Sequence, residues 1–324
     1  MGRNVFFMNL TCHICANRDN NNAYLCHEKM FGFGDEFRYF QCGRCGCLQI
    51  AQVPENLSRY YPPHYYSFGM APLPTRGLKS WLAARRDRAR LTWLGRLGLL
   101  GGWQEVRLDV ASLGRVPLRA DMRILDVGCG QGQLLSLLHR AGFRRLLGID
   151  PYLADDLEVV PGLYVRKQVL KNLNESFDFI MLHHVFEHLE DGLEMLLSCR
   201  ERLAPAGSIL LRLPTVESTA WERYRDNWVQ LDAPRHLFLH TRESLRLLTD
   251  RAGLRIRECW CDSTEFQFWA SELYRRGIPH TDALGRVAQP QDHFSPAELA
   301  AFRREAVAAN KAHRGDQLVV LLTK

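Results

Sequence analysis

The chain lacks the features that mark several large classes of protein. No run approaches 18 consecutive apolar residues, which argues against a membrane-spanning helix. The first ten residues hold only a short apolar stretch, and Phe6 stands where an N-myristoylation signal needs Ser or Thr. We therefore expect neither a secretory signal nor a lipid anchor, and a cytoplasmic protein.

The composition shows little bias. Hydrophobic residues make up 46% and charged residues 24% of the chain, so a collagen-like, low-complexity or disordered protein is excluded. The 42 Lys and Arg exceed the 36 Asp and Glu by only six, which permits an anionic partner without requiring one.

The 324 residues suggest about two domains, and their composition changes along the chain. Six of the ten cysteines precede residue 50, which indicates a small cysteine-rich module over residues 1–53. Residues 54–118 contain a connector rich in Pro and Tyr, followed by a basic segment that we expect to be helical between residues 76 and 100. The remaining 119–324 form the main domain.

Strands and helices alternate through 119–324, which predicts a doubly wound, mostly parallel α/β sheet. Ser295-Pro296-Ala297-Glu298 has the pattern of a capping box, so we expect a helix from there to about Lys311. The expected strands are 122–127, 145–149, 163–168, 177–182, 208–213, 254–260 and 317–322.

A glycine-rich loop follows the first of these strands. Asp126 precedes it and Gly128, Gly130 and Gly132 lie within it. A dinucleotide-binding loop would place its third glycine one residue later, and Asp126 would repel a pyrophosphate. A ligand with positive charge and no phosphate suits the loop better, and S-adenosylmethionine is such a ligand. Asp150 ends the second strand, where an acid can accept hydrogen bonds from ribose hydroxyls.

These motifs resemble those of the class I S-adenosylmethionine-dependent methyltransferases over residues 120–260. The resemblance implies a Rossmann-like sheet of seven strands whose last strand, 317–322, is antiparallel. It also implies that S-adenosylmethionine binds along the carboxyl edge of the sheet, where Gln168 ends the third strand and His183 follows the fourth. The expected cofactor-binding residues are Asp126, Gly128, Gly130, Gly132, Asp150, Gln168 and His183.

Two Cys-x-x-Cys pairs lie in the N-terminal module. Cys12 and Cys15 form the first pair, and Cys42 and Cys45 form the second. In a reducing compartment such pairs usually bind metal, so we expect a zinc ribbon with one tetrahedral Zn²⁺. Four thiolates leave no open coordination position, so this zinc should be structural. Cys26 and Cys47 do not fit the spacing.

The segment after the fourth main-domain strand carries the candidate catalytic residues. His184, Glu187 and His188 share one face if a helix has begun there, and His or Glu can remove a proton from a methyl acceptor. The alternative is that these residues cap the helix and fix the loop. A metal site is less favoured, because relatives that bind metal here have Glu at the position of His184.

An insertion at 214–240 is rich in aromatic residues, and a second insertion at 263–316 could form a lid. Trp221, Tyr224 and Trp228 could stack on an acceptor, Arg235 could bind a phosphate, and His236 is a second candidate base. The segment 232–237 resembles one in methyltransferases of polysaccharide and deoxysugar biosynthesis.

Three functions remain open. The favoured one is methylation of oxygen or carbon in a sugar, sugar nucleotide or polysaccharide. The alternative is RNA methylation, in which the cysteine module and the basic segment bind phosphates. A degenerate, protein-binding methyltransferase is less favoured, because Asp126, the three glycines and Asp150 are all present. The sequence indicates neither the oligomeric state nor the methylated atom.

Overall fold

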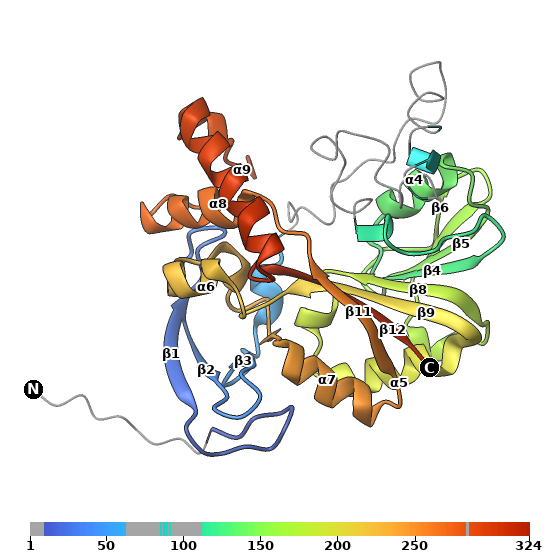
Figure 1. Ribbon diagram of the computed structural model, residues 1–324, viewed down its shortest axis with the longest axis horizontal. Helices are drawn as coiled ribbons and strands as arrows, with labels where there is room; N and C mark the ends of the chain where they lie inside the picture. The colour runs from blue at the N-terminus through green and yellow to red at the C-terminus, as the bar shows by residue number, and fades with distance from the viewer. Residues whose placement is uncertain (1–9, 63–84, 86, 90, 92–111, 283–284) are drawn as a thin grey trace, which may run out of the picture.

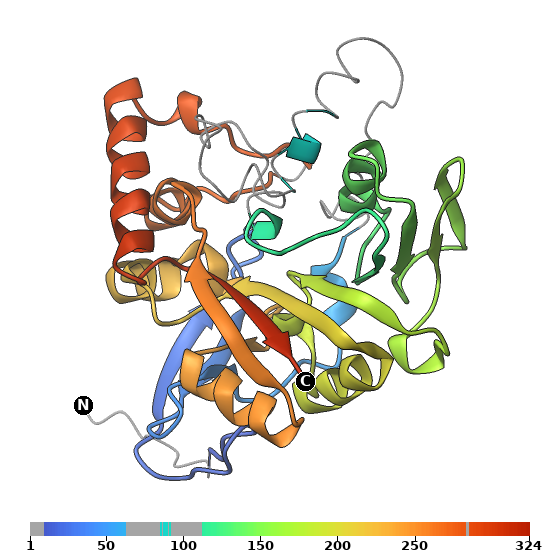
Figure 2. The same ribbon diagram turned by 45° about the vertical axis from the view of Figure 1, so that its right-hand side comes forward.

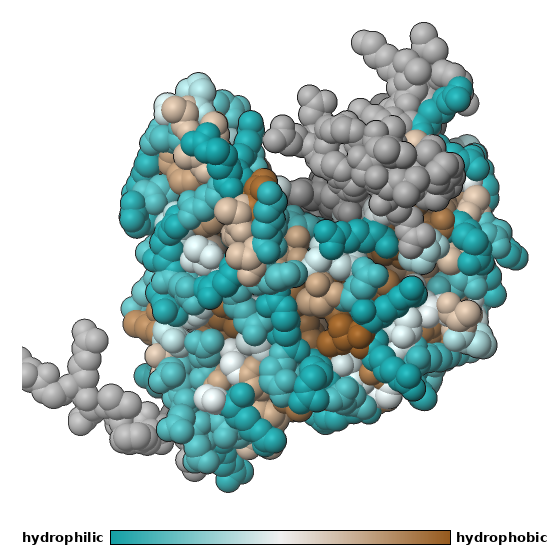
Figure 3. Space-filling model, viewed as in Figure 1, coloured by the Kyte–Doolittle hydropathy of each residue, from teal (hydrophilic) through white to brown (hydrophobic). Residues whose placement is uncertain are grey.

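The computed structural model describes residues 10–62, 85, 87–89, 91, 112–282 and 285–324 (Figure 1). Most of the basic segment at 76–100 and the second half of the connector lie outside these residues. Among the described residues, no helix is long and apolar enough to cross a membrane. Hydrophilic residues cover most of the described surface on the face shown in Figure 3.

A small antiparallel sheet forms the N-terminal part of the molecule. Its strands are β1 (Asn22–His27), β2 (Glu36–Gln41) and β3 (Leu48–Ile50), and the two-residue strand β10 (Phe238–Leu239) completes it. Because β10 comes from the insertion at 214–240, the N-terminal sheet shares a strand with the main domain.

The main sheet has the order β11-β12-β9-β8-β4-β5-β7-β6. The five strands β9, β8, β4, β5 and β7 are parallel, whereas β12 runs antiparallel to β9, as expected for a methyltransferase sheet. This fold prediction is confirmed, and the described residues add an eighth strand, β6, which pairs antiparallel with β7 in a hairpin. The strands are β4 (Arg123–Val127), β5 (Arg145–Ile149), β6 (Leu157–Val160), β7 (Leu163–Arg166), β8 (Phe177–His183), β9 (Leu203–Pro214), β11 (Arg255–Cys261) and β12 (Gln317–Thr323).

Helices cover both faces of this sheet. In Figures 1 and 2, α4 (Gln133–Arg140) lies on one face, and α5 (Gly192–Arg202) and α7 (Arg242–Arg251) lie together on the other. The helices α6 (Thr219–Tyr224), α8 (Phe266–Arg275) and α9 (Pro296–Lys311) pack beyond the carboxyl edge. The capping box at the start of α9 is present as expected. The short 3-10 helices are Leu57–Tyr60, Leu170–Asn172, Phe186–His188, Arg225–Asn227, Val229–Leu231 and Pro290–Asp292.

Alternate residues of the central strands enter two separate hydrophobic cores, one on each face of the sheet. The core that packs against α5 and α7 continues into the N-terminal sheet through Tyr39, Phe40 and Leu48. This continuity means that the small sheet and the main sheet bury apolar surface against each other. In β12, the residues that enter this core are Leu318, Val320 and Leu322. Val319 and Leu321 enter the core on the opposite face of the sheet.

Candidate active site and cysteine cluster

The glycine loop between β4 and α4 depends on backbone conformations that favour glycine. Gly128, Gly130 and Gly132 have φ values of 71°, 52° and 77°. A Cβ at Gly128 would lie 2.4 Å from Cγ2 of Val185, and one at Gly132 would lie 2.8 Å from Cγ2 of Val165. The loop therefore packs so tightly against Val185 and Val165 that Gly128 and Gly132 have no room for a side chain. Because Val185 follows His184, this contact also joins the glycine loop to the histidine segment.

Asp150, at the end of β5, is tied to this loop. One of its carboxylate oxygens accepts a hydrogen bond from Gly130 N at 3.0 Å, and the other accepts one from Tyr152 N at 2.9 Å. Asp126 is buried at the end of β4. The structure therefore brings Asp126, the three glycines and Asp150 together at the carboxyl ends of two adjacent strands.

The other two expected cofactor-binding residues lie at the same edge of the sheet. His183 is the last residue of β8, next to β4, and Gln168 follows β7 by two residues. Both side chains are half-buried.

The histidine segment is a turn rather than the start of a helix. His184 has a φ of 54°, the 3-10 helix 186–188 follows, and α5 begins only at Gly192. His184 and Glu187 nevertheless meet, as their spacing suggested, and Nδ1 of His184 lies 3.2 Å from Oε1 of Glu187. The carboxylate of Glu187 is fully buried. Its Oε2 has no hydrogen-bond partner among the described residues, so one acceptor position stays available.

His188 and His236 meet from two different segments. Their rings lie edge to face with centroids 4.7 Å apart. Nδ1 of His188 lies 2.8 Å from the carbonyl oxygen of Arg235, and Nδ1 of His236 lies 2.7 Å from the carbonyl oxygen of Gln230. A carbonyl oxygen only accepts, so each Nδ1 carries the proton and donates it. In the neutral form of either ring the lone pair is therefore on Nε2.

Glu187 completes a cluster with these two histidines. Nε2 of His236 lies 3.9 Å from Oε1 of Glu187. One potential ligand atom from each of Glu187, His188 and His236 lies within 4.8 Å of the other two, so the cluster could also hold a divalent metal.

The charge states in this cluster follow from burial and proximity. Burial opposes ionisation of Glu187, but the hydrogen bond from His184 and the nearby imidazoles outweigh it and lower the pKa of Glu187 to about 2. Burial disfavours a charged imidazole, and together with the neighbouring His188 it lowers the pKa of His236 to about 4. Near neutral pH the cluster therefore holds a carboxylate beside a neutral imidazole.

Arg212 in β9 belongs to the site and was missed by the sequence analysis. Its guanidinium donates to Nε2 of His184 and, through Nε, to Asp262 at 2.8 Å. Both ring nitrogens of His184 are thus engaged, which favours a positioning role for His184 over the base role that the sequence suggested. An arginine inside an otherwise apolar strand was the available signal, because a buried cation needs a partner.

Two expectations for the insertion at 214–240 were wrong. The aromatic side chains of Trp221, Tyr224 and Trp228 are buried, with at most 6% of any residue exposed, so their ring faces pack within the insertion. Trp221 also borders the cavity described below. Arg235 is fully buried and pairs with Asp232 and Glu28, so it does not bind a phosphate.

A cavity of about 490 Å³ lies beside this insertion. None of the expected cofactor-binding or catalytic residues lines it. Among its lining residues are Trp221, Arg225, Arg242 and Arg314.

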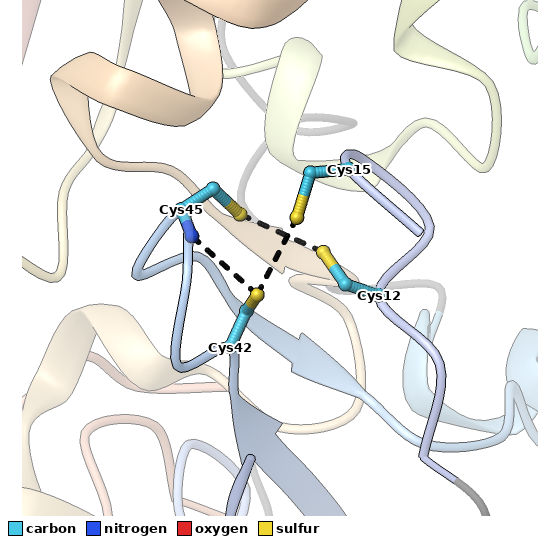
Figure 4. A group of neighbouring side chains, drawn as sticks. All are labelled: Cys12, Cys15, Cys42 and Cys45. Carbon is cyan, nitrogen blue, oxygen red and sulfur yellow. Dashed lines mark hydrogen bonds between the residues drawn. The ribbon is translucent and has the colours of Figure 1, made fainter. Parts of the chain in front are cut away.

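The four expected cysteine ligands converge (Figure 4). The Sγ atoms of Cys12 and Cys45 lie 3.6 Å apart, as do those of Cys15 and Cys42. Zn–S bonds of 2.3 Å in a tetrahedron place the sulfurs about 3.8 Å apart, whereas a disulfide would place them about 2 Å apart. The donor set and its spacing therefore fit one tetrahedral zinc ion.

Neighbouring groups donate hydrogen bonds to these sulfurs. Gln49 Nε2 donates to Cys12 at 3.2 Å, and Arg44 N donates to Cys42 at 3.3 Å. Such donors stabilise thiolates. Cys26 and Cys47 are buried outside the cluster.

The main domain is similar to known methyltransferases. Residues 104–258 match the family described as a methyltransferase domain. Among curated relatives, a tRNA U34 carboxymethyltransferase of Klebsiella pneumoniae is 27% identical over 195 residues, 54% of this chain and 55% of that protein. The mitochondrial ubiquinone biosynthesis O-methyltransferase of Rattus norvegicus is 36% identical over 106 residues, 28% of this chain and 30% of that protein.

The chain therefore spans only about half the length, or less, of these relatives. Among solved structures, a SAM-dependent methyltransferase from Archaeoglobus fulgidus is 20% identical, with a TM-score of 0.39 over 62% of this chain and 86% of that chain.

Proposed function

We propose that this chain, which contains a class I S-adenosylmethionine-dependent methyltransferase domain, methylates an oxygen or carbon atom of a small acceptor, and that the acceptor is a sugar, a sugar nucleotide or a glycan. The main support is the junction of the glycine loop and the histidine segment, where Gly128 packs against Val185. That contact supports the proposal, because it joins the glycine loop to the segment that carries His184, Glu187 and His188.

The glycine loop suits S-adenosylmethionine. When bound, this cofactor supplies a methyl group on a positively charged sulfur. The positive φ values of Gly128, Gly130 and Gly132 turn the chain sharply at the carboxyl edge of the sheet, where glycine lets a ligand approach the backbone. Asp150, oriented by Gly130 N, would accept hydrogen bonds from two adjacent ribose hydroxyls. The carboxylate of Asp126 favours a cationic ligand over a phosphate.

His188 and His236 are the proposed bases. In each, Nδ1 donates to a backbone carbonyl, which leaves the Nε2 lone pair to take a proton from the acceptor. Glu187, held by His184, would stabilise the imidazolium that forms, as a carboxylate does in other acid–base sites. His184 and Arg212 therefore do not contact the acceptor in this proposal; they position the carboxylate of Glu187.

Burial of the cluster bears on the size of the acceptor. Only 4% of His236 is exposed, and Glu187 is fully buried. A base in this position reaches a small molecule more readily than a group on a large surface. The resemblance of segment 232–237 to enzymes of polysaccharide and deoxysugar biosynthesis favours a sugar.

RNA is the second candidate acceptor. It is favoured by the relatives named tRNA U34 carboxymethyltransferases and by the basic sequence at 76–96. RNA binding through phosphates would weaken steeply with salt. We expect no such binding; tight, salt-sensitive affinity for tRNA would favour this candidate instead.

We also propose that Cys12, Cys15, Cys42 and Cys45 bind one structural Zn²⁺. The four sulfurs have the spacing of a tetrahedral site and leave no coordination position for a substrate.

Two experiments test the proposed activity. Calorimetry should show binding of S-adenosylhomocysteine and none of NAD; the reverse result would contradict the proposal. Transfer of labelled methyl from S-adenosylmethionine to a panel of sugar nucleotides should then identify an acceptor, with Asp150→Ala as the inactive control.

A further inference from the structure

The N-terminal sheet reaches the histidine cluster through a short path of backbone hydrogen bonds. Strand β3 pairs with β10, and Ile50 N donates to the carbonyl oxygen of Leu237 at 2.9 Å. Leu237 N in turn donates to the carbonyl oxygen of Glu187 at 2.8 Å. Two hydrogen bonds through one residue thus connect β3 to the backbone of Glu187.

A second connection runs from β2 to His236. The side chain of Tyr39 is fully buried, and its hydroxyl donates to the carbonyl oxygen of His236 at 2.8 Å. This hydrogen bond holds the backbone carbonyl of His236, and the carbonyl oxygen of Gln230 holds Nδ1 of its ring.

A buried ion pair forms the third connection. Arg235 donates to Glu28 of the N-terminal module at 2.8 Å and to Asp232 in its own loop at 2.6 Å. It also donates to the carbonyl oxygen of Tyr60 at 3.0 Å. The carbonyl oxygen of this same Arg235 accepts the Nδ1 proton of His188. Glu28 therefore helps to hold the peptide group that orients His188.

The first connection ends at the backbone of Glu187, and the other two end at His236 and His188, the residues that carry the Nε2 lone pairs. We infer that the N-terminal module is a positioning element for the active site, and that Glu28, Tyr39 and Arg235 set the ring orientations of His188 and His236. The inference rests on the proposed function, since it takes these histidines as the bases. It goes beyond that function by giving the cysteine-rich module a part in catalysis rather than in folding alone.

The arrangement also explains why Arg235 is arginine. Its guanidinium serves Glu28, Asp232 and the Tyr60 carbonyl at once, in a fully buried position. A lysine ammonium carries the same charge but lacks the planar array of donors. Asp232 is itself in a left-handed conformation, with φ of 40°, so the loop is held in this shape by its partners.

The test follows the ring protons of the two histidines and needs no acceptor. In protein labelled with ¹⁵N-histidine, NMR measures how fast the Nδ1 protons of His188 and His236 exchange with water. Tyr39→Phe removes one hydrogen bond and leaves the aromatic packing, so we expect exchange at His236 to become about ten-fold faster, the effect of about 1.4 kcal/mol. Glu28→Gln should have a similar effect at His188.

Tyr24→Phe is the matched control. Tyr24 lies in the same sheet, but its hydroxyl donates to Gln41 at 3.4 Å and not to the histidine loop. This variant should leave both exchange rates unchanged. If Glu28→Gln fails to fold, Tyr39→Phe alone decides the question.

Binding of S-adenosylhomocysteine, measured by calorimetry on the same samples, separates this inference from the proposed function. We expect the wild type, Tyr39→Phe and Glu28→Gln to bind it with similar affinity. Unchanged proton exchange in Tyr39→Phe would overturn the positioning role, even if binding is intact. Loss of binding in Tyr39→Phe would also overturn it, because the module would then support the whole site. Absence of binding in the wild type would instead refute the proposed function.

Discussion

Adding one methyl group at Gly128 should lower both the stability of the protein and its affinity for S-adenosylhomocysteine. In Gly128→Ala the residue keeps a φ of 71°, which costs an alanine about 1–2 kcal/mol. Its Cβ would also meet Cγ2 of Val185 at 2.4 Å, and overpacking of this kind costs about 1–3 kcal/mol. The free energy of unfolding should therefore fall by about 2–5 kcal/mol. Val185 must move, and the histidine segment must move with it.

Gly162→Ala provides the matched control. Gly162 has a φ of 83°, but a Cβ there would meet nothing within 4 Å, so this variant carries the backbone strain without the clash. Urea unfolding should show a loss of about 1–2 kcal/mol for Gly162→Ala and a larger one for Gly128→Ala. Calorimetry should show S-adenosylhomocysteine affinity unchanged in Gly162→Ala and at least about ten-fold weaker in Gly128→Ala.

The double variant Gly128→Ala with Val185→Ala tests the cause. Removing the methyl groups of Val185 should restore part of the lost affinity, because it removes the clash. The reasoning would be refuted if Gly128→Ala behaved like Gly162→Ala in both stability and affinity.

Three further predictions concern charge and metal. Asp150→Ala should weaken S-adenosylhomocysteine binding by about 10–100-fold, whereas His236→Gln should change it little and mainly slow methyl transfer; equal losses of affinity would contradict this division of roles. Burial lowers the pKa of both His236 and His240 to about 4, so the unfolded chain binds more protons between pH 6.5 and 4. Stability should accordingly fall by up to about 3 kcal/mol per histidine as pH drops through that range, and His240→Gln should flatten the pH dependence of urea unfolding; an unchanged slope would argue against burial as the cause. Metal analysis should find one zinc per chain, and chelators should remove it without loss of S-adenosylhomocysteine binding. The Cys42→Ser variant should contain no zinc; zinc retained in that variant would indicate the histidine cluster as a second site.

Local patterns predicted the main sheet well. The glycine loop, the capping box at Ser295 and the apolar strand 317–322 are each marked by a residue pattern within one short segment, and all three are present. The two Cys-x-x-Cys pairs were also informative: the hairpin of β1 and β2 lies between them, its open end pairs Asn22 with Gln41, and the four cysteines lie together.

What the sequence could not supply were the contacts made over long separations. Arg235 looked like a free phosphate ligand because its partner Glu28 lies 207 residues away. The aromatic residues of the insertion looked available because nothing local shows that the N-terminal sheet packs against them, as Tyr24 does against Trp221. The histidine spacing suggested a helix, whereas the left-handed φ of His184, which lies between Arg212 and Glu187, makes a turn there.

The pairing of β3 with β10 has a consequence for biosynthesis. Phe238 follows its partner Gln49 by 189 residues (238 minus 49). At about 5–20 residues per second, the ribosome takes about 10–40 s to make the intervening chain. During that interval the nascent hairpin has an open edge at β3, the kind of edge that recruits foreign strands. Early binding of zinc would shorten the exposure of the cysteine thiols. The edge of β3 is covered only when β10 has been made, so we expect the nascent chain to need chaperones most before residue 238 emerges.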